Sequence, residues 1–336
     1  MQPFFPISYS TLSQDALSDF ITVNYRVGLA RCRFLVRGVG DTYLVEADHT
    51  KYIFRVYRAT HRGLPVIASE MTLLTKLKEA GVSVSYPIPD KKGELIQPFN
   101  VPEGTRYGVL FSFAEGKVIN APDETQLKSL GHEMAKFHSL SSSIKLDGVT
   151  RKFDLQTTLF DPLEKTKHFF ASDPEGYGSL CQTAKKIEHE LAAIDTDSFS
   201  KGYCHYDFLP KNFHFDGAKV TFFDFDFLGY GWLVNDLMIF WQHLCLDIFF
   251  NRTTKESAIK NFRIFINAYR EIKDLKDEEL NIIPLLSPGF WLFYMQFHST
   301  HDQFYPLIFE PATLKMRTGL IRQLIANNWY WPEELM

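Results

Sequence analysis

Apolar residues recur along the chain with two different periods. Over residues 11–27 they return at roughly helical spacing, which predicts a helix. Residues 33–58 change to short extended runs separated by turns, the first of which contains Gly38 and Gly40. This pattern predicts three antiparallel strands directly after the first helix.

The balance of helix and strand changes near residue 114. Before it, a second helix is expected around residues 67–80 and a further strand at residues 107–113. After it, a helix is expected from about residue 122 to 140, and nearly all of the chain from residue 232 onward has a helical pattern. The sequence therefore predicts an α+β, bilobal architecture. A small antiparallel-sheet lobe spans 1–114 and a larger, mostly helical lobe spans 115–336.

Composition narrows the functional class. The 336-residue chain has 45% hydrophobic and 23% charged residues and a net charge of −4, so it lacks the basic character of a dedicated nucleic-acid binder. Its most apolar segment, residues 232–250, contains Asn, Asp, Gln and His, and therefore predicts a buried helix rather than a membrane span. Four widely spaced cysteines and the lack of a signal-peptide pattern predict a cytoplasmic protein.

Two charged residues stand on faces that should be buried. Arg55 shares a strand face with Ile53 and Tyr57, and Glu70 shares a helix face with leucines. Because an inward charge is costly unless it is paired, the two residues are expected to form an ion pair. The alternative is that Arg55 extends to the edge of the sheet and Glu70 lies at the rim.

The densest chemistry lies in the segment His205-Tyr-Asp-Phe-Leu-Pro-Lys-Asn212, followed by Asp224-Phe-Asp226. An Asp-Gly turn between them predicts a hairpin that returns the second segment toward the first. Carboxylates and a carboxamide can hold Mg²⁺ together with nucleotide phosphates and can supply a proton acceptor, as phosphoryl transfer requires. The alternative is that Asp207 and Asn212 are ordinary turn and cap residues.

In their order along the chain, these features resemble the aminoglycoside phosphotransferase and choline kinase group of protein-kinase-like small-molecule kinases. The resemblance runs from about Phe34 to Asp236. It implies ATP-dependent transfer of the γ-phosphoryl group to a hydroxyl of a small-molecule acceptor, with Mg²⁺ as the metal and GTP open as another donor. It implies no nucleic-acid or membrane partner.

The resemblance also implies roles for individual residues of the second lobe. Asp207 would orient or deprotonate the acceptor hydroxyl, and Asn212 and Asp224 would hold Mg²⁺. His205, Asp226 and Asp236 would support them, the last by bracing the catalytic loop.

The first lobe carries the nucleotide-binding roles that the resemblance implies. Gly40 and Thr42 would belong to the loop over the phosphates, although the full three-glycine pattern of protein kinases is absent. Arg55 stands where the family has a lysine that pairs with a helix glutamate, here Glu70, and touches the α and β phosphates. Backbone groups near Ser112 and Ala114 would meet the adenine edge.

The chain departs from the family pattern beside the presumed base. Tyr206 replaces the usual glycine, and Leu209 stands where histidine is frequent. Tyr206 therefore supports a second hypothesis, a catalytically weak or inactive kinase-like protein that binds nucleotide. A third is a metal-dependent hydrolase that uses His205, Asp207, Asp224 and Asp226. The sequence selects no particular acceptor.

Overall fold

The computed structural model describes residues 5, 7–58 and 60–332. The chain forms two compact units. The first unit comprises Met1–Glu115, Lys145–Val149 and Thr221–Asp226, and the second comprises Gly116–Ile144, Thr150–Val220 and Phe227–Met336. The main segment of the first unit ends at Glu115, and two short later segments of the chain also belong to this unit.

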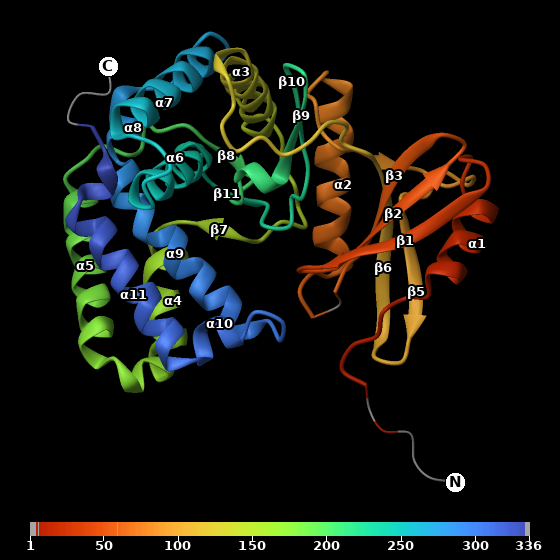
Figure 1. The fold of residues 1–336 in the computed structure, drawn as a ribbon, viewed down its shortest axis with the longest axis horizontal. Coiled ribbons are helices and arrows are strands. Elements are labelled where there is room, and N and C mark those ends of the chain that lie inside the picture. The colour runs from red at the N-terminus through yellow and green to blue at the C-terminus, as the bar shows by residue number, and fades with distance from the viewer. Residues whose placement is uncertain (1–4, 6, 59, 333–336) are drawn as a thin grey trace. The chain divides into compact units, whose positions relative to one another are not determined.

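The first unit is an antiparallel sheet with one helix on each face (Figure 1). Its strands follow the order β1-β2-β3-β6-β4, and β5 pairs with β6. The elements are α1 (Gln14–Asn24), β1 (Ala30–Arg37), β2 (Asp41–Ala47), β3 (Thr50–Val56), α2 (Leu64–Glu79), β4 (Pro87–Ile88), β5 (Ile96–Val101) and β6 (Gly104–Ser112).

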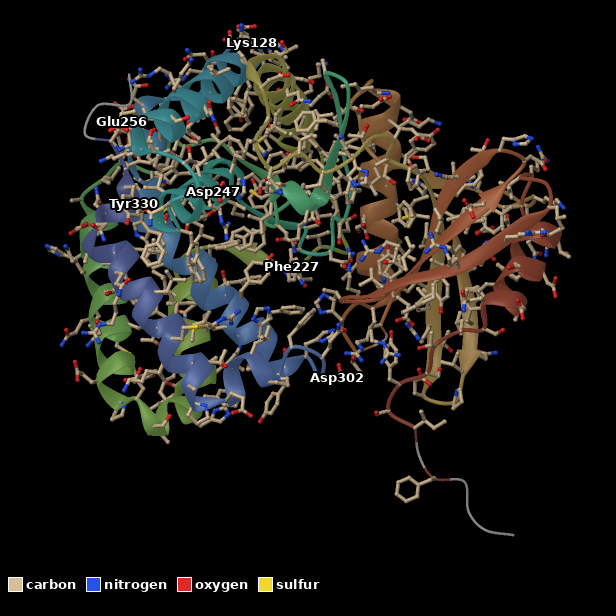
Figure 2. The ribbon with its side chains drawn as sticks, viewed as in Figure 1. Lys128, Phe227, Asp247, Glu256, Asp302 and Tyr330 are labelled. Carbon is tan, nitrogen blue, oxygen red and sulfur yellow. The ribbon has the colours of Figure 1, made fainter. Side chains whose placement is uncertain are left out.

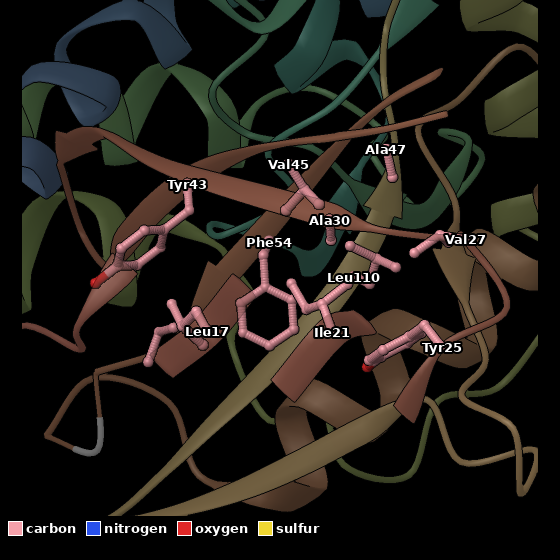
Figure 3. Close-up of a cluster of buried hydrophobic side chains, with 11 residues drawn as sticks. Leu17, Ile21, Tyr25, Val27, Ala30, Tyr43, Val45, Ala47, Phe54 and Leu110 are labelled. Atoms are coloured by element: carbon pink, nitrogen blue, oxygen red, sulfur yellow. The ribbon is translucent and has the colours of Figure 1, made fainter. Parts of the chain in front are cut away.

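Helix α1 covers the face of the sheet to which Phe54 and Val56 point. Its side chains Leu17 and Ile21 pack with these two residues and with Leu110 in one buried cluster (Figure 3). Alternate residues of β3 lie on opposite faces of the sheet. Arg55 therefore lies on the other face, where Tyr57 contacts α2, and the strand register fixes its direction.

The second unit is mostly helical (Figure 1). Its elements, including one strand that crosses the unit boundary, are α3 (Glu124–Ser141), β7 (Lys152–Phe153), the π-helical turn η1 (Gln156–Phe160), α4 (Asp161–Thr166), η2 (Lys167–Ser172), α5 (Pro174–Ala192), β8 (Lys201–Cys204), η3 (Pro210–Asn212), β9 (Phe213–Asp216), β10 (Lys219–Phe222), β11 (Gly229–Trp232), α6 (Val234–Phe249), α7 (Lys255–Arg270), α8 (Asp277–Asn281), α9 (Ile283–Thr300), α10 (Pro306–Phe309), α11 (Pro311–Ala326) and η4 (Asn328–Tyr330).

A three-stranded sheet in the order β7-β11-β8 lies among these helices. Strand β8 ends at Cys204, and the predicted catalytic loop begins with the next residue. The apolar segment around residues 232–250 forms the buried helix α6, as predicted. In the described part of the chain, no helix has both the length and the apolar character needed to span a membrane.

Candidate active site

The loop that follows β8 is held by one buried carboxylate. Asp236, in the first turn of α6, accepts hydrogen bonds from the backbone N–H groups of His205 and Tyr206, each at 2.8 Å. The Nε2 atom of His138 lies 3.1 Å from the same carboxylate, and its Nδ1 lies 2.9 Å from the hydroxyl of Tyr269. Since all five residues are buried, these bonds fix the loop backbone in one position.

His138 should make this support sensitive to acid. Burial lowers the pKa of its imidazole below the ordinary value of 6.5, although the Asp236 carboxylate opposes the shift. The unfolded chain then binds the proton more tightly than the folded one, so stability present above pH 6.5 is lost as the pH falls below that value. We expect a slope of up to about 1.4 kcal/mol per pH unit from this group. Urea unfolding between pH 7 and 5 should show a smaller slope for His138→Gln, and an unchanged slope would contradict the assignment.

Asp207 is buried and its two carboxylate oxygens have different surroundings. Its Oδ2 accepts from the Asn212 side-chain amide at 2.7 Å and lies 2.8 Å from the Lys211 ammonium. Its Oδ1 is also buried but has no hydrogen-bond partner among the described residues. A buried acceptor normally has a partner, so Oδ1 is suited to accept a hydrogen bond from a ligand.

Tyr206 adopts a backbone conformation that favours glycine. Its φ is +58°, which gives a physical reason for the glycine that is usual at this position in the resembling family. Its ring stacks on Phe153 with 3.5 Å between centroids and meets Phe293 edge-on at 5.1 Å. Only 1% of the residue is exposed, so the ring belongs to an aromatic core beneath the loop.

Replacing Tyr206 with glycine should therefore destabilise the second unit. The change relieves about 1 kcal/mol of backbone strain, but removing a buried ring costs about 3–5 kcal/mol. We expect a net loss of about 2–4 kcal/mol, measured by urea unfolding. Tyr206→Phe, which keeps the ring, is the matched control and should stay close to the wild type. A Tyr206→Gly variant more stable than the wild type would show that backbone strain dominates.

Arg55 in the first unit pairs with both carboxylates of the second predicted segment. Its Nη1 donates to Asp224 at 2.8 Å and its Nη2 to Asp226 at 2.5 Å. Burial alone would raise the pKa of the Asp226 carboxyl, but Arg55 and Arg62 outweigh burial and hold that pKa below its ordinary value. Asp226 therefore stays ionised. Asp224 is more exposed and has a φ of +67°, a strained conformation often found at functional positions.

The predicted ion pair between Arg55 and Glu70 is wrong. Glu70 is buried on α2 as expected, but its carboxylate accepts from Arg62 Nη1 at 2.6 Å and from the Tyr57 hydroxyl at 3.0 Å. The same Arg62 atom also donates to Asp226 at 3.1 Å. Arg62 lies two residues before the first residue of α2 and pairs with Glu70, whereas Arg55 pairs with the two aspartates.

Two further residues near these carboxylates escaped the sequence interpretation. Arg62 lies in the loop between β3 and α2, where no periodic pattern indicates a direction for the side chain. Its Nε and Nη2 are buried without a hydrogen-bond partner among the described residues. Lys211 contacts Asp207, and its spacing of four residues from the aspartate was the one signal that could have indicated it.

The predicted phosphate loop forms the turn between β1 and β2. A Cβ on Gly40 would lie 2.7 Å from the backbone oxygen of Val56, so a side chain there would force the strands apart. Thr42 stands directly opposite Arg55 in the ladder of β2 and β3. Residues opposite each other point to the same face, so Thr42 and Arg55 are neighbours on one side of the sheet.

The predicted hinge lies at the end of β6. The Ser112 N–H donates to Tyr86 O at 2.9 Å, and the Ser112 carbonyl accepts from the Ser85 hydroxyl at 2.6 Å. Both backbone groups of Ser112 are thus engaged within the first unit. Ala114, the other residue of the predicted hinge, is buried.

Asn212 and Asp224 have the chemistry that Mg²⁺ requires. Both present oxygen donors, and Mg²⁺ is commonly held by one or two carboxylate or amide ligands plus phosphate oxygens. Asn212 donates through Nδ2 to the backbone carbonyl and the carboxylate of Asp207, so its side-chain oxygen is not used in these bonds. Among the described residues, no group of three or more His, Cys, Asp or Glu side chains is placed to hold a metal by itself.

The sequence matches a known protein family over most of its length. The family is described as "Phosphotransferase enzyme family", and its sequence model covers residues 31–271. Amicoumacin kinase of Bacillus subtilis is 28% identical over 277 residues, covering 80% of this chain and 80% of that protein. Homoserine kinase of Parvibaculum lavamentivorans is 24% identical over 289 residues, covering 84% of each chain.

Solved structures share the fold. Amicoumacin kinase hAmiN, solved in complex with AMP-PNP, Ca²⁺ and Ami, superimposes with a TM-score of 0.75 at 17% identity, covering 96% of each chain. At this identity the likeness shows the fold alone. It confirms the predicted α+β fold with a small sheet unit and a larger helical one.

Proposed function

The chain belongs to the phosphotransferase enzyme family, and on this premise we propose that it transfers the γ-phosphoryl group of ATP to a hydroxyl of a small molecule. The observation that carries the proposal is the buried Oδ1 of Asp207. It has no hydrogen-bond partner among the described residues and stands on a loop fixed from behind by Asp236. A positioned carboxylate oxygen of this kind can orient the acceptor hydroxyl and take its proton.

Asp207 would act through one oxygen while the other holds it in place. Asn212 and Lys211 both engage Oδ2, so the carboxyl group cannot rotate freely. The hydroxyl of the acceptor would donate to Oδ1, which directs an oxygen lone pair toward the γ-phosphorus. Since phosphoryl transfer depends mainly on positioning, a carboxylate held in a fixed place contributes more to the rate than a strongly basic one.

The charges on the nucleotide require cationic partners. Asn212 and Asp224 would hold Mg²⁺, which neutralises phosphate charge as the γ-phosphoryl group leaves. Arg55, fixed on β3 by Asp224 and Asp226, would contact the remaining phosphates. Arg62 supports this arrangement by joining Glu70 to Asp226.

The hydrolase alternative is set aside. It would use His205, Asp207, Asp224 and Asp226 as metal ligands, and it leaves the largely buried charges of Arg55 and Glu70 without a role. Membership of a phosphotransferase family also favours transfer to an alcohol over hydrolysis.

A product assay over a panel of acceptors tests the proposal. The protein is incubated with Mg-ATP and with small alcohols, amino alcohols, sugars or aminoglycosides, and ³¹P NMR detects any phosphate ester. We expect a new ester signal with at least one hydroxylated acceptor. ATP binding without transfer to any member of the panel would instead favour the catalytically weak alternative.

A further inference from the structure

A pocket of about 290 Å³ in the second unit is not used by the mechanism above. It is built from the segment entering β7, from the turn η1, from α4 and from α9. Thr157 of η1 and Phe293 and Gln296 of α9 line it. A π-helical turn is rare and frequently occurs at a functional site, so η1 in the wall of this pocket favours a binding role for the pocket.

The pocket is positively charged. Arg151, Lys152 and Lys165 line it together with a single carboxylate, that of Asp161. That carboxylate accepts from the Gln156 amide at 2.5 Å and lies 4.0 Å from the Lys165 ammonium. Lys152 is an exposed residue of β7. Lys165 faces Asp161, and Arg151 and Lys152 add further cationic side chains to the lining, which favours an anionic ligand.

Aromatic contacts join this pocket to the catalytic loop. Phe293 lines the pocket and meets the ring of Tyr206 at 5.1 Å. Phe153, next to Lys152 in β7, stacks on the same ring at 3.5 Å. Tyr206 directly precedes Asp207, so one packed cluster supports both the catalytic loop and the wall of the pocket.

The small sheet places Arg151 and Lys152 level with the end of β8 where the loop begins. In β11, Gly229 pairs with Cys204, the last residue of β8, and Tyr230 pairs with Lys152 of β7. The Arg151 side chain passes beside Gly229, and its guanidinium lies 5.4 Å from the ring of Phe227, labelled in Figure 2. Two strand spacings, about 10 Å, therefore separate β7 from the strand that leads to Asp207.

We propose that this cationic pocket binds an anionic group of the acceptor, a carboxylate or a phosphate ester, while the acceptor hydroxyl meets Asp207. This inference rests on the proposed phosphotransferase function and names the class of its substrate. The size of the pocket suits one small charged group. The bond changes are those of the proposed reaction: the hydroxyl oxygen gains the phosphoryl group, ADP leaves, and Asp207 accepts the proton.

Three matched acceptors test the charge requirement. Glycerol, glycerate and glycerol 3-phosphate carry hydroxyls with no charge, a carboxylate or a phosphate ester, and kcat/KM is measured for each with Mg-ATP. We expect one of the two anions to exceed glycerol by at least about 10-fold, as one charge-assisted hydrogen bond supplies. The preferred anion shows whether the acceptor carries a carboxylate or a phosphate ester.

A charge-reversal variant ties any preference to this pocket. In Lys152→Glu the ratio of kcat/KM for the preferred anion to that for glycerol should fall by about 10-fold or more. The matched control is Lys185→Glu, which reverses an exposed lysine on α5 outside the pocket and should leave the ratio unchanged. An equal ratio in wild type and Lys152→Glu, or a preference for glycerol, would overturn the proposal.

Binding separates this inference from the proposed function. Calorimetry with glycerate and glycerol 3-phosphate should detect an anion that the wild type binds and Lys152→Glu loses, even when no phosphoryl transfer occurs. Such binding without transfer would support the pocket and count against the phosphotransferase activity. Transfer to neutral alcohols, with neither anion bound at millimolar concentration, would support the phosphotransferase activity and overturn the inference about the pocket.

Discussion

Asp207→Ala is expected to lower kcat for phosphoryl transfer by about 10²- to 10⁴-fold while leaving Mg-ATP affinity nearly unchanged. The variant loses the Oδ1 acceptor that would orient the hydroxyl, and it frees Asn212 and Lys211 from Oδ2. The backbone of the loop should remain in place, because Asp236 holds the N–H groups of residues 205 and 206. Steady-state kinetics with an accepted hydroxyl compound and calorimetry with a non-hydrolysable ATP analogue measure the two quantities.

Two further variants sharpen the Asp207 experiment. Asp207→Asn preserves the shape but keeps only one acceptor oxygen, which Asn212 and Lys211 engage, so it tests whether the reaction needs the second oxygen as an acceptor. Asp274→Ala removes an exposed aspartate of the same unit and should leave kcat unchanged. Turnover of Asp207→Ala at the wild-type rate would show that another group positions the acceptor.

Arg62→Leu is expected to destabilise the first unit by about 3–5 kcal/mol. The side chains of Arg62 and Glu70 are each only 2% exposed, so the substitution leaves a carboxylate in the interior without its cation. Asp226 loses its ion pair with Arg62 at the same time and keeps the one with Arg55. Urea unfolding followed by a probe in the first unit measures the change, because the two units need not unfold together.

The double variant Arg62→Leu/Glu70→Leu distinguishes ion pairing from simple loss of packing. Removing both charges should recover part of the lost stability, since no unpaired carboxylate then remains on α2. Arg33→Leu, at an exposed position of β1, is the control and should change stability by less than about 0.5 kcal/mol. A double variant as unstable as Arg62→Leu would mean that packing, rather than the unpaired charge, causes the effect.

The buried charges show where sequence reasoning succeeds and where it stops. Strand and helix periodicity placed both Arg55 and Glu70 on inward faces, and both are largely buried. Periodicity says nothing about a loop residue, so Arg62 could not be recognised as the partner of Glu70. The segment 221–226 belongs to the first unit although it lies more than 100 residues after Glu115, where the main segment of that unit ends, and no local signal indicates that Arg55 would meet it.

Tyr206 gives the same lesson within the catalytic loop. Its departure from the expected glycine was visible in the sequence, but the sequence could not tell whether the ring would enter an acceptor site. The structure directs the ring onto Phe153 and Phe293 in a buried cluster. The backbone keeps the left-handed conformation that glycine would adopt more readily.

The sequence by itself determined the α+β class, the order of the main elements and the family, because these depend on periodicity and on short motifs that are local in the chain. Only the tertiary structure decided which charges pair, where the ring of Tyr206 lies and which cations gather beside the catalytic loop. These depend on side chains from distant segments, and the energy of a buried charge is set by the partner that the fold brings to it. The roles of Asp207, Asn212 and Asp224 in the reaction stay predictions, to which the structure adds a fixed carboxylate and named partners.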